Sequence, residues 1–216
     1  MNRNRRLAIG WLALGIAAFA LVPWYALPDG VLRIGWIANY LGKDNAPGIV
    51  QSVLHGRAWL LPLALLLVVG AYFATALKSR KTRSATLIVV GALGFLYLLA
   101  QGFAIGARGF SYPWLAAAFG PVASGQYGMG LGAALTAAAF AMTFATAIAE
   151  RGAFRGDAFV ACSVVAVSAL VAAFIFYPVV TILVQAAQDA EGAWSLTAFG
   201  GRLFTEKIWG IGCLAG

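Results

Sequence analysis

Apolar and polar positions alternate along the chain in long blocks rather than residue by residue. Five apolar segments are each close to the length that a membrane crossing requires, namely residues 7–27, 59–77, 84–107, 128–149 and 158–187. A helix needs roughly twenty apolar residues to cross about 30 Å of hydrocarbon. The pattern therefore predicts an all-α fold, a polytopic transmembrane helix bundle of about five spans.

The connections between these segments carry most of the polar residues. Residues 28–58 are mixed in character and are predicted to form a loop outside the membrane with a short interfacial helix. The fifth segment is longer than one crossing requires, and Pro178 predicts a kink in it, because proline removes a backbone donor. The apolar stretch 211–216 then predicts the start of a sixth element. This ending leads us to expect that the sequence is the amino-terminal part of a longer protein.

The composition is that of a protein surrounded by lipid. Hydrophobic residues make up 62% of the chain, charged residues make up only 10%, and the mean hydropathy is +0.87. A soluble domain is about half apolar and a quarter charged, so a water-facing surface is not expected. The net charge of +8 would indicate a nucleic-acid partner if the cations gathered on one face or arm. They lie instead in clusters between the apolar segments, so no nucleic-acid partner is predicted.

The cationic clusters predict how the chain is oriented. Lysine and arginine are retained on the cytoplasmic side of membrane proteins. With the amino terminus in the cytoplasm, nine cations fall in inside segments: Arg3, Arg5, Arg6, Lys78, Arg80, Lys81, Arg83, Arg151 and Arg155. Six fall in the longer outside segments: Arg33, Lys43, Arg57, Arg108, Arg202 and Lys207. This orientation also places five of the seven tryptophans, at positions 24, 36, 59, 114 and 194, on outer segments or interfaces.

The first apolar segment has two interpretations. Ala18-Phe19-Ala20 imitates the cleavage site of a secretory signal peptide. The apolar stretch continues past that site to a full spanning length and ends in Trp24 and Tyr25, which favours an uncleaved anchor. Both interpretations place the amino terminus in the cytoplasm.

The apolar segments lack the residues that catalysis or ion coupling requires. No Asp, Glu, Lys, Arg or His lies between the ends of any segment, whereas intramembrane ionisable residues mark proton relays and ion sites. His55, the only histidine, lies in a loop and not on a span, where an axial haem ligand would be needed. Ser163 and Ser168 have no base within sequence reach, and the two cysteines form no metal-ligand spacing. We therefore predict no enzyme activity, and we name no catalytic, cofactor-binding or metal-binding residue.

The segments do carry residues suited to helix packing. Gly102 with Gly106, and Gly128 with Gly132, form G-x-x-x-G spacings that allow helix backbones to approach closely. Close packing inside one bundle is favoured over a dedicated dimer face. Gln101 is interpreted as a hydrogen-bonding partner for a neighbouring helix, with a place on a solute path as the alternative.

The fifth segment and the residues after it resemble a known family. Residues 173–199 read AFIFYPVVTILVQAAQDAEGAWSLTAF, in which an apolar helix with a Tyr-Pro near its outer end leads to a short external segment with a Ser-Leu and an aromatic. This arrangement resembles the start of the permease unit in bacterial ABC importers of the ferric-iron type. The residues that carry the resemblance are Phe176, Tyr177, Pro178, Ser195, Leu196 and Phe199. The resemblance divides the chain into an amino-terminal extension with four spans, residues 1–157, and the start of a permease unit, residues 158–216.

The resemblance implies a transport function. Such permeases form the membrane pathway in the bacterial inner membrane, receive solute from an external solute-binding protein, and are powered by a separate cytoplasmic ATP-binding subunit. The family couples to that subunit through a loop with a Glu-Ala-Ala signature followed by Gly, and Glu150-Arg151-Gly152 does not match it. The alternatives from other classes are a structural protein that scaffolds a larger membrane complex and an uncoupled channel.

Overall fold

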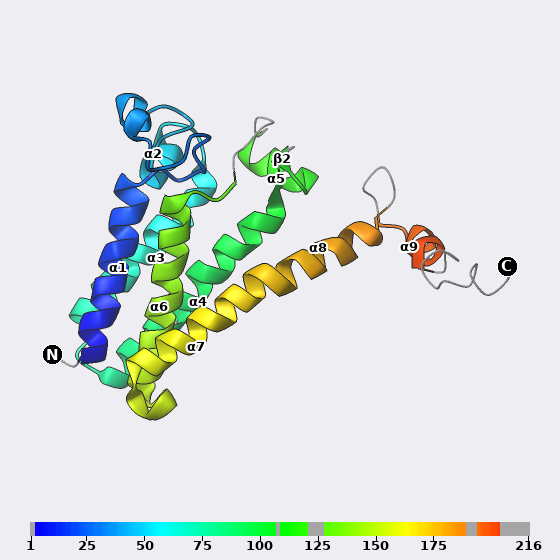
Figure 1. Ribbon diagram of the computed structural model, residues 1–216. Coiled ribbons are helices and arrows are strands. Elements are labelled where there is room, and N and C mark those ends of the chain that lie inside the picture. The colour runs from blue at the N-terminus through cyan, green and yellow to red at the C-terminus, as the bar shows by residue number, and fades with distance from the viewer. Residues whose placement is uncertain (1–2, 107–108, 121–127, 189–193, 204–216) are drawn as a thin grey trace. The chain divides into compact units, whose positions relative to one another are not determined.

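A computed structural model describes residues 3–106, 109–120, 128–188 and 194–203 (Figure 1). The chain forms two compact units, Met1–Ala166 and Val167–Gly216. The described residues contain five helices that are long and apolar enough to cross a membrane, which confirms the predicted all-α transmembrane fold. The protein is therefore a multi-pass helical membrane protein.

Four of these helices lie entirely in the first unit, which also contains the start of the fifth. They are α1 (Arg3–Leu21), α3 (Leu61–Ala76), α4 (Arg80–Ala104) and α6 (Leu131–Arg151). Helix α1 packs against α3 and α6, and α4 packs against the same two helices, so each helix has two neighbours. Successive helices run in opposite directions along the bundle (Figure 1). The connection from α3 to α4, residues 77–79, is short, as is typical of antiparallel neighbours in helix bundles.

Helix α6 is the most deeply buried of the four, because its small residues let α1 and α4 approach closely. More than half of its most apolar stretch is buried (56%), against 33% for α1 and 28% for α4. Phe140 of α6 is fully buried and lies against Gly94 of α4. At Gly91, one turn earlier, a Cβ atom would lie 2.7 Å from the Phe140 carbonyl oxygen. The closest approach of α4 to α6 therefore depends on glycine in α4.

The end of this bundle where α1 finishes is covered by short elements. They are η1 (Ile34–Asn39), α2 (Gly48–Val53), η2 (Ala58–Leu60), the strand pair β1 (Ile105–Gly106) and β2 (Gly109–Phe110), and α5 (Pro113–Phe119). The predicted loop with a short helix between the first two spans corresponds to η1 and α2. Isolated bridges join Pro23 to Pro47 and Tyr25 to Met129, which ties the end of α1 to the loop and to the start of α6.

Two spans extend further than their apolar residues predict. Helix α1 begins at Arg3 and α4 begins at Arg80, whereas the apolar segments begin at residues 7 and 84. Arginine and lysine are good helix formers, and Ser79 caps α4 by accepting a hydrogen bond from the Thr82 N–H at 3.4 Å. The predicted Gly102–Gly106 motif is not a helix face, because α4 ends at Ala104 and Gly106 lies in β1.

The fifth membrane-length helix runs from Ala158 to Ala186. Helix α7 (Ala158–Val171) passes through a π-helical turn, Ala172–Phe176, into α8 (Tyr177–Ala186). The N–H of Tyr177 bonds the Ala172 carbonyl, five residues back. This turn lies directly before Pro178, whose missing N–H disturbs the α-helical hydrogen-bond ladder at this point.

The second unit contains α8 and, after it, α9 (Leu196–Leu203). The Phe199 N–H bonds the Ser195 carbonyl at 3.1 Å, so Ser195 stands at the start of this helix. The predicted sixth element at residues 211–216, together with Arg108 and Lys207, lies outside the described residues. The division of the chain at residue 157 on the basis of the family resemblance stays a prediction.

Candidate functional site

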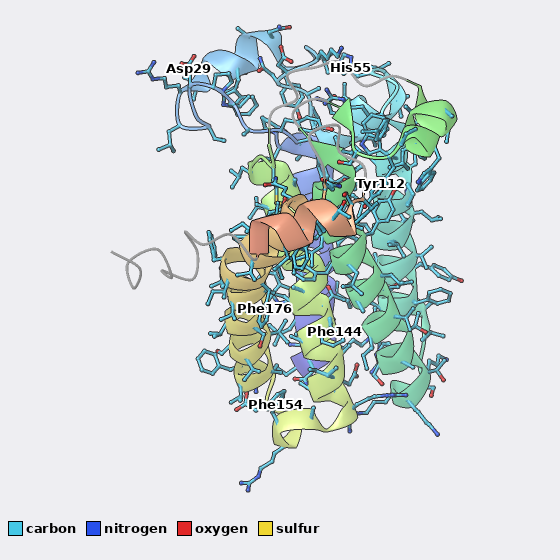
Figure 2. The ribbon with its side chains drawn as sticks, turned by 90° about the vertical axis from the view of Figure 1, so that its right-hand side faces the viewer. Asp29, His55, Tyr112, Phe144, Phe154 and Phe176 are labelled. Atoms are coloured by element: carbon cyan, nitrogen blue, oxygen red, sulfur yellow. The ribbon has the colours of Figure 1, made fainter. Side chains whose placement is uncertain are left out.

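One end of the first unit gathers all nine cations that the sequence assigns to the inside. The amino terminus of α1, the α3–α4 junction and the turn after α6 lie together there (Figure 1). Glu150 and Asp157 are the acidic residues at this end. We call this region the cationic end. Figure 2 shows its Phe154 at the opposite end of the bundle from Asp29, His55 and Tyr112.

An ion pair is buried at the cationic end. The Arg83 guanidinium donates to the Glu150 carboxylate, and the two side chains are only 5% and 1% exposed. Arg83 also donates to the carbonyls of Leu77 at 2.9 Å and Lys78 at 3.4 Å. Burying charges is tolerated when they are paired and hydrogen-bonded. The pair therefore fixes the α3–α4 junction against the last turn of α6.

Other arginines at this end bind the last carbonyls of helices. The Arg80 guanidinium donates to the Glu150 backbone oxygen. Arg5 of α1 donates to the carbonyls of Ala74 at 2.9 Å and Thr75 at 2.5 Å, in the last turn of α3. Helix carboxyl ends carry carbonyls without intrahelical donors and a partial negative charge, which cations stabilise. Arginines from α1 and α4 thus cap the antiparallel helices beside them.

The turn after α6 holds an unusual backbone. Phe154 and Arg155 have φ values of 52° and 57°, in the left-handed region that non-glycine residues rarely adopt. Gly152 and Gly156, on either side, also have positive φ. The Gly156 carbonyl accepts a hydrogen bond from the Asn4 side chain at 3.2 Å, which fixes the turn against α1. The turn is therefore held by α1, while the side chains of Phe154 and Arg155 are exposed.

A second polar group lies at the opposite end of this unit. The Arg57 guanidinium sits over the Tyr25 ring, 4.1 Å from the ring centroid, and Arg57 is only 7% exposed. Burial lowers the pKa of Arg57, an effect that Tyr25 opposes. Burial raises the pKa of Tyr25, and the Arg57 charge opposes that shift. A desolvated cation–π contact of this kind stabilises the fold by about 2 kcal/mol.

The start of α3 is fixed to α4 by two hydrogen bonds. The backbone oxygen of Trp59 accepts from the Tyr97 hydroxyl at 2.7 Å and from the Gln101 amide at 3.3 Å. The interpretation of Gln101 as a hydrogen-bonding partner for a neighbouring element is confirmed. Its alternative role on a solute path receives no support from this geometry.

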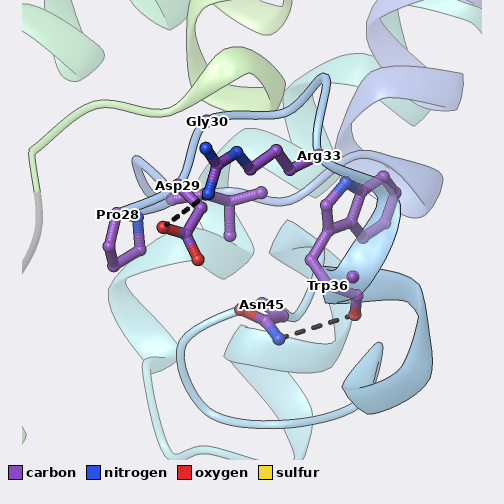
Figure 3. Close-up of a pocket in the computed structure, with 8 residues that line it drawn as sticks. Pro28, Asp29, Gly30, Arg33, Trp36 and Asn45 are labelled. Atoms are coloured by element: carbon purple, nitrogen blue, oxygen red, sulfur yellow. Dashed lines mark hydrogen bonds and ion pairs between the residues drawn. The ribbon is translucent and has the colours of Figure 1, made fainter.

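A shallow pocket of about 310 Å³ opens in the loop after α1. Figure 3 shows its lining residues: Leu27, Pro28, Asp29, Gly30, Arg33, Gly35, Trp36 and Asn45. Arg33 and Asp29 pair at 3.8 Å, and both side chains are 79% exposed. Exposed pairs of this kind contribute little to stability or recognition. The pocket holds no buried charge, so it is a weaker candidate site than the cationic end.

No protein-family model, curated protein or solved structure matches the chain. The assignment of functional residues therefore depends on the sequence and on the geometry above.

The sequence alone did not reveal the buried pair at the cationic end. Arg83 and Glu150 are separated by 67 positions, and in the sequence both lie in connecting segments between apolar stretches. One signal was available, because Glu150 is the acidic residue that directly follows the fourth apolar segment, where positive charge is the rule. A carboxylate that directly follows an apolar segment, among cations, indicates a partner on a neighbouring helix.

Proposed function

We propose that the chain is the membrane-spanning permease subunit of an ABC importer for ferric iron or a similar small solute. The observation that carries the proposal is the segment with Tyr177 and Pro178 in an apolar helix, followed by Ser195 at the start of a short helix. This order of elements agrees with the family resemblance. The proposal places the chain in a bacterial inner membrane with its amino terminus in the cytoplasm.

The composition of the fifth membrane-length helix supports this proposal. It is the most apolar of the five, and it carries no charged residue from Ala158 to Ala186. In a membrane such a helix contacts lipid or other helices. A permease pathway built from several spans would supply helices for it to pack against.

The source of energy also favours an ATP-driven system. The spans carry no ionisable residue in their apolar centres, and Arg83 and Glu150 lie near helix ends, where they neutralise each other. Coupling to an ion gradient needs ionisable groups inside the membrane. We propose that a separate cytoplasmic ATP-binding subunit drives transport, that an external solute-binding protein delivers the solute, and that this chain performs no catalytic step.

Uptake measurements test the proposal. Deletion of the gene should abolish uptake of radioactive ferric iron in iron-starved cells, and the wild-type gene should restore it. Uptake should stop when ATP is depleted with arsenate and should persist when a protonophore collapses the proton gradient. Uptake that stops when the proton gradient is collapsed and persists when ATP is depleted would contradict the proposal.

A scaffold is the second candidate, because a long apolar helix of this kind also suits assembly with another membrane protein. In that case deletion should leave iron uptake intact and destabilise a partner complex. Solute flux through the purified chain in liposomes without any ATPase would instead indicate an uncoupled channel.

A further inference from the structure

We propose that the cationic end of the first unit binds the headgroups of anionic phospholipids, with Arg151 and Arg155 as principal contacts. The proposal rests on the membrane fold and not on transport. Its test is therefore independent of the permease proposal.

Some of the cations at this end already have partners within the protein. Arg5, Arg80 and Arg83 donate to helix carbonyls or to Glu150. Arg3 lies 3.9 Å from Asp157. The side chains of five cations make no hydrogen bond or ion pair within the described parts of the chain, and all five residues are exposed: Arg6, Lys78, Lys81, Arg151 and Arg155.

No carboxylate at this end remains to neutralise these five cations. Glu150 is buried against Arg83. Asp157 lies near Arg3 and accepts a hydrogen bond from the Phe159 N–H at 2.8 Å. The nine cations and two carboxylates at this end leave seven uncompensated positive charges. Cations clustered beside membrane spans attract anionic headgroups. Each cation near the surface contributes about 1 kcal/mol to the free energy of binding.

The strained turn after α6 presents an apolar and a cationic side chain together. Backbone strain persists where surrounding structure enforces it and is concentrated at functional positions. Here the Asn4 bond to Gly156 holds the turn, and Phe154, 41% exposed, stands beside the exposed Arg155. A phenylalanine side chain inserts at the boundary between headgroups and acyl chains, and guanidinium groups bind phosphate through paired hydrogen bonds. Adjacent apolar and cationic side chains match the boundary between acyl chains and phosphate.

The contacts also place the unpaired cations close together. The Arg80 bond to Glu150 brings the α3–α4 junction, with Lys78 and Lys81, beside the end of α6. Arg151 follows Glu150 directly, and Arg155 lies in the next turn. The cations of two separate connections can therefore act on the same headgroup region.

Lipid association measured by electron spin resonance tests this proposal. The whole chain is reconstituted in phosphatidylcholine vesicles with spin-labelled phosphatidylglycerol or spin-labelled phosphatidylcholine. The wild type should prefer phosphatidylglycerol. Arg155→Asn should lower that preference roughly fivefold, the equivalent of one cation near the surface. Asn tolerates the left-handed conformation, so this variant should fold even if the double variant R151Q/R155Q does not; the double variant should show the larger loss.

A control variant removes two cations elsewhere, the same number as in the double variant R151Q/R155Q. The variant R33Q/K43Q loses two exposed cations at the opposite end of the unit and should keep the wild-type preference. Equal preference in wild type and R155N, or equal loss in R33Q/K43Q, would overturn the proposal. Displacement of the lipid by 10 mM inorganic phosphate at constant ionic strength, a concentration chosen to be roughly that of an ordinary buffer and to leave screening unchanged, would assign the cations to a free anion and would also overturn it.

Discussion

At the scale of single residues, charge is placed differently at the two ends of the first unit. At the cationic end Glu150 is almost fully buried and paired with Arg83. At the other end Arg57 is buried against an aromatic face. In both places a charged group that would be unfavourable alone is stabilised by one specific neighbour.

Removing the carboxylate of the buried pair should strongly destabilise the protein. Glu150→Gln leaves the Arg83 charge buried without a counter-charge, which should lower the free energy of unfolding by about 3–5 kcal/mol. Denaturation by SDS in mixed micelles measures this change. The exposed pair supplies the control, because Arg3 and Asp157 are 73% and 48% exposed and 3.9 Å apart, so Asp157→Asn should cost less than about 1 kcal/mol. Equal losses of unfolding free energy in the two variants would refute a stabilising role for the buried pair.

Ionisation of Tyr25 should make stability depend on pH. Burial raises its pKa in the folded state, whereas the unfolded value is about 10. The folded state then holds the proton more tightly, so this contribution is fully present below pH ~10 and is lost as pH rises through the folded pKa. Between pH 9 and 11, values chosen to span roughly that unfolded pKa, the unfolding temperature of the wild type should fall further than that of Tyr25→Phe. Parallel pH profiles would contradict the account.

At the scale of elements, α6 is the helix around which the first unit is packed. Its alanines and threonines are buried against α1 and α4, and glycines of α4 allow the closest approach. Close packing replaces the hydrophobic effect as the force between helices in lipid.

Adding one methyl group at the α4–α6 contact should therefore be harmful. In Gly91→Ala the new Cβ would lie 2.7 Å from backbone atoms of Phe140 and Phe144, so α6 must shift. We expect a loss of about 1–3 kcal/mol in the same SDS titration. In Gly10→Ala of α1 the new Cβ would meet no atom of another element within 4 Å. This substitution should leave the free energy of unfolding unchanged or slightly raised. A neutral Gly91→Ala would show that α6 packs elsewhere.

The sequence predicted the spans well and their polar contacts poorly, for a physical reason. Hydropathy is local, so runs of apolar residues locate helices without knowledge of their neighbours. Helix ends are less certain, because the cations from Arg3 and Arg80 onward are polar in sequence and helical in structure. The Arg83–Glu150 pair depends on which helices become neighbours, and no local pattern encodes that. Pro178 predicted a kink, and the structure shows a π-helical turn directly before it.

At the scale of the whole molecule, charge and aromatic residues separate along the first unit. The nine predicted inside cations share one end. Trp24, Trp36, Trp59 and Trp114 lie on the segments of the other end. This separation is that of a protein fixed across a membrane in one orientation.

The most direct test of the central claim is the labelling of single cysteines at the two ends of α4. Ser79 precedes this helix, Ser111 follows β2, and both are exposed. At about 1.5 Å per residue, α4 is long enough to cross the hydrocarbon. With Cys162 and Cys213 replaced by serine, a membrane-impermeant maleimide should label Ser111→Cys from outside intact cells and Ser79→Cys only after permeabilisation. Labelling of both positions from the same side would contradict a membrane-spanning α4 and the fold built around it.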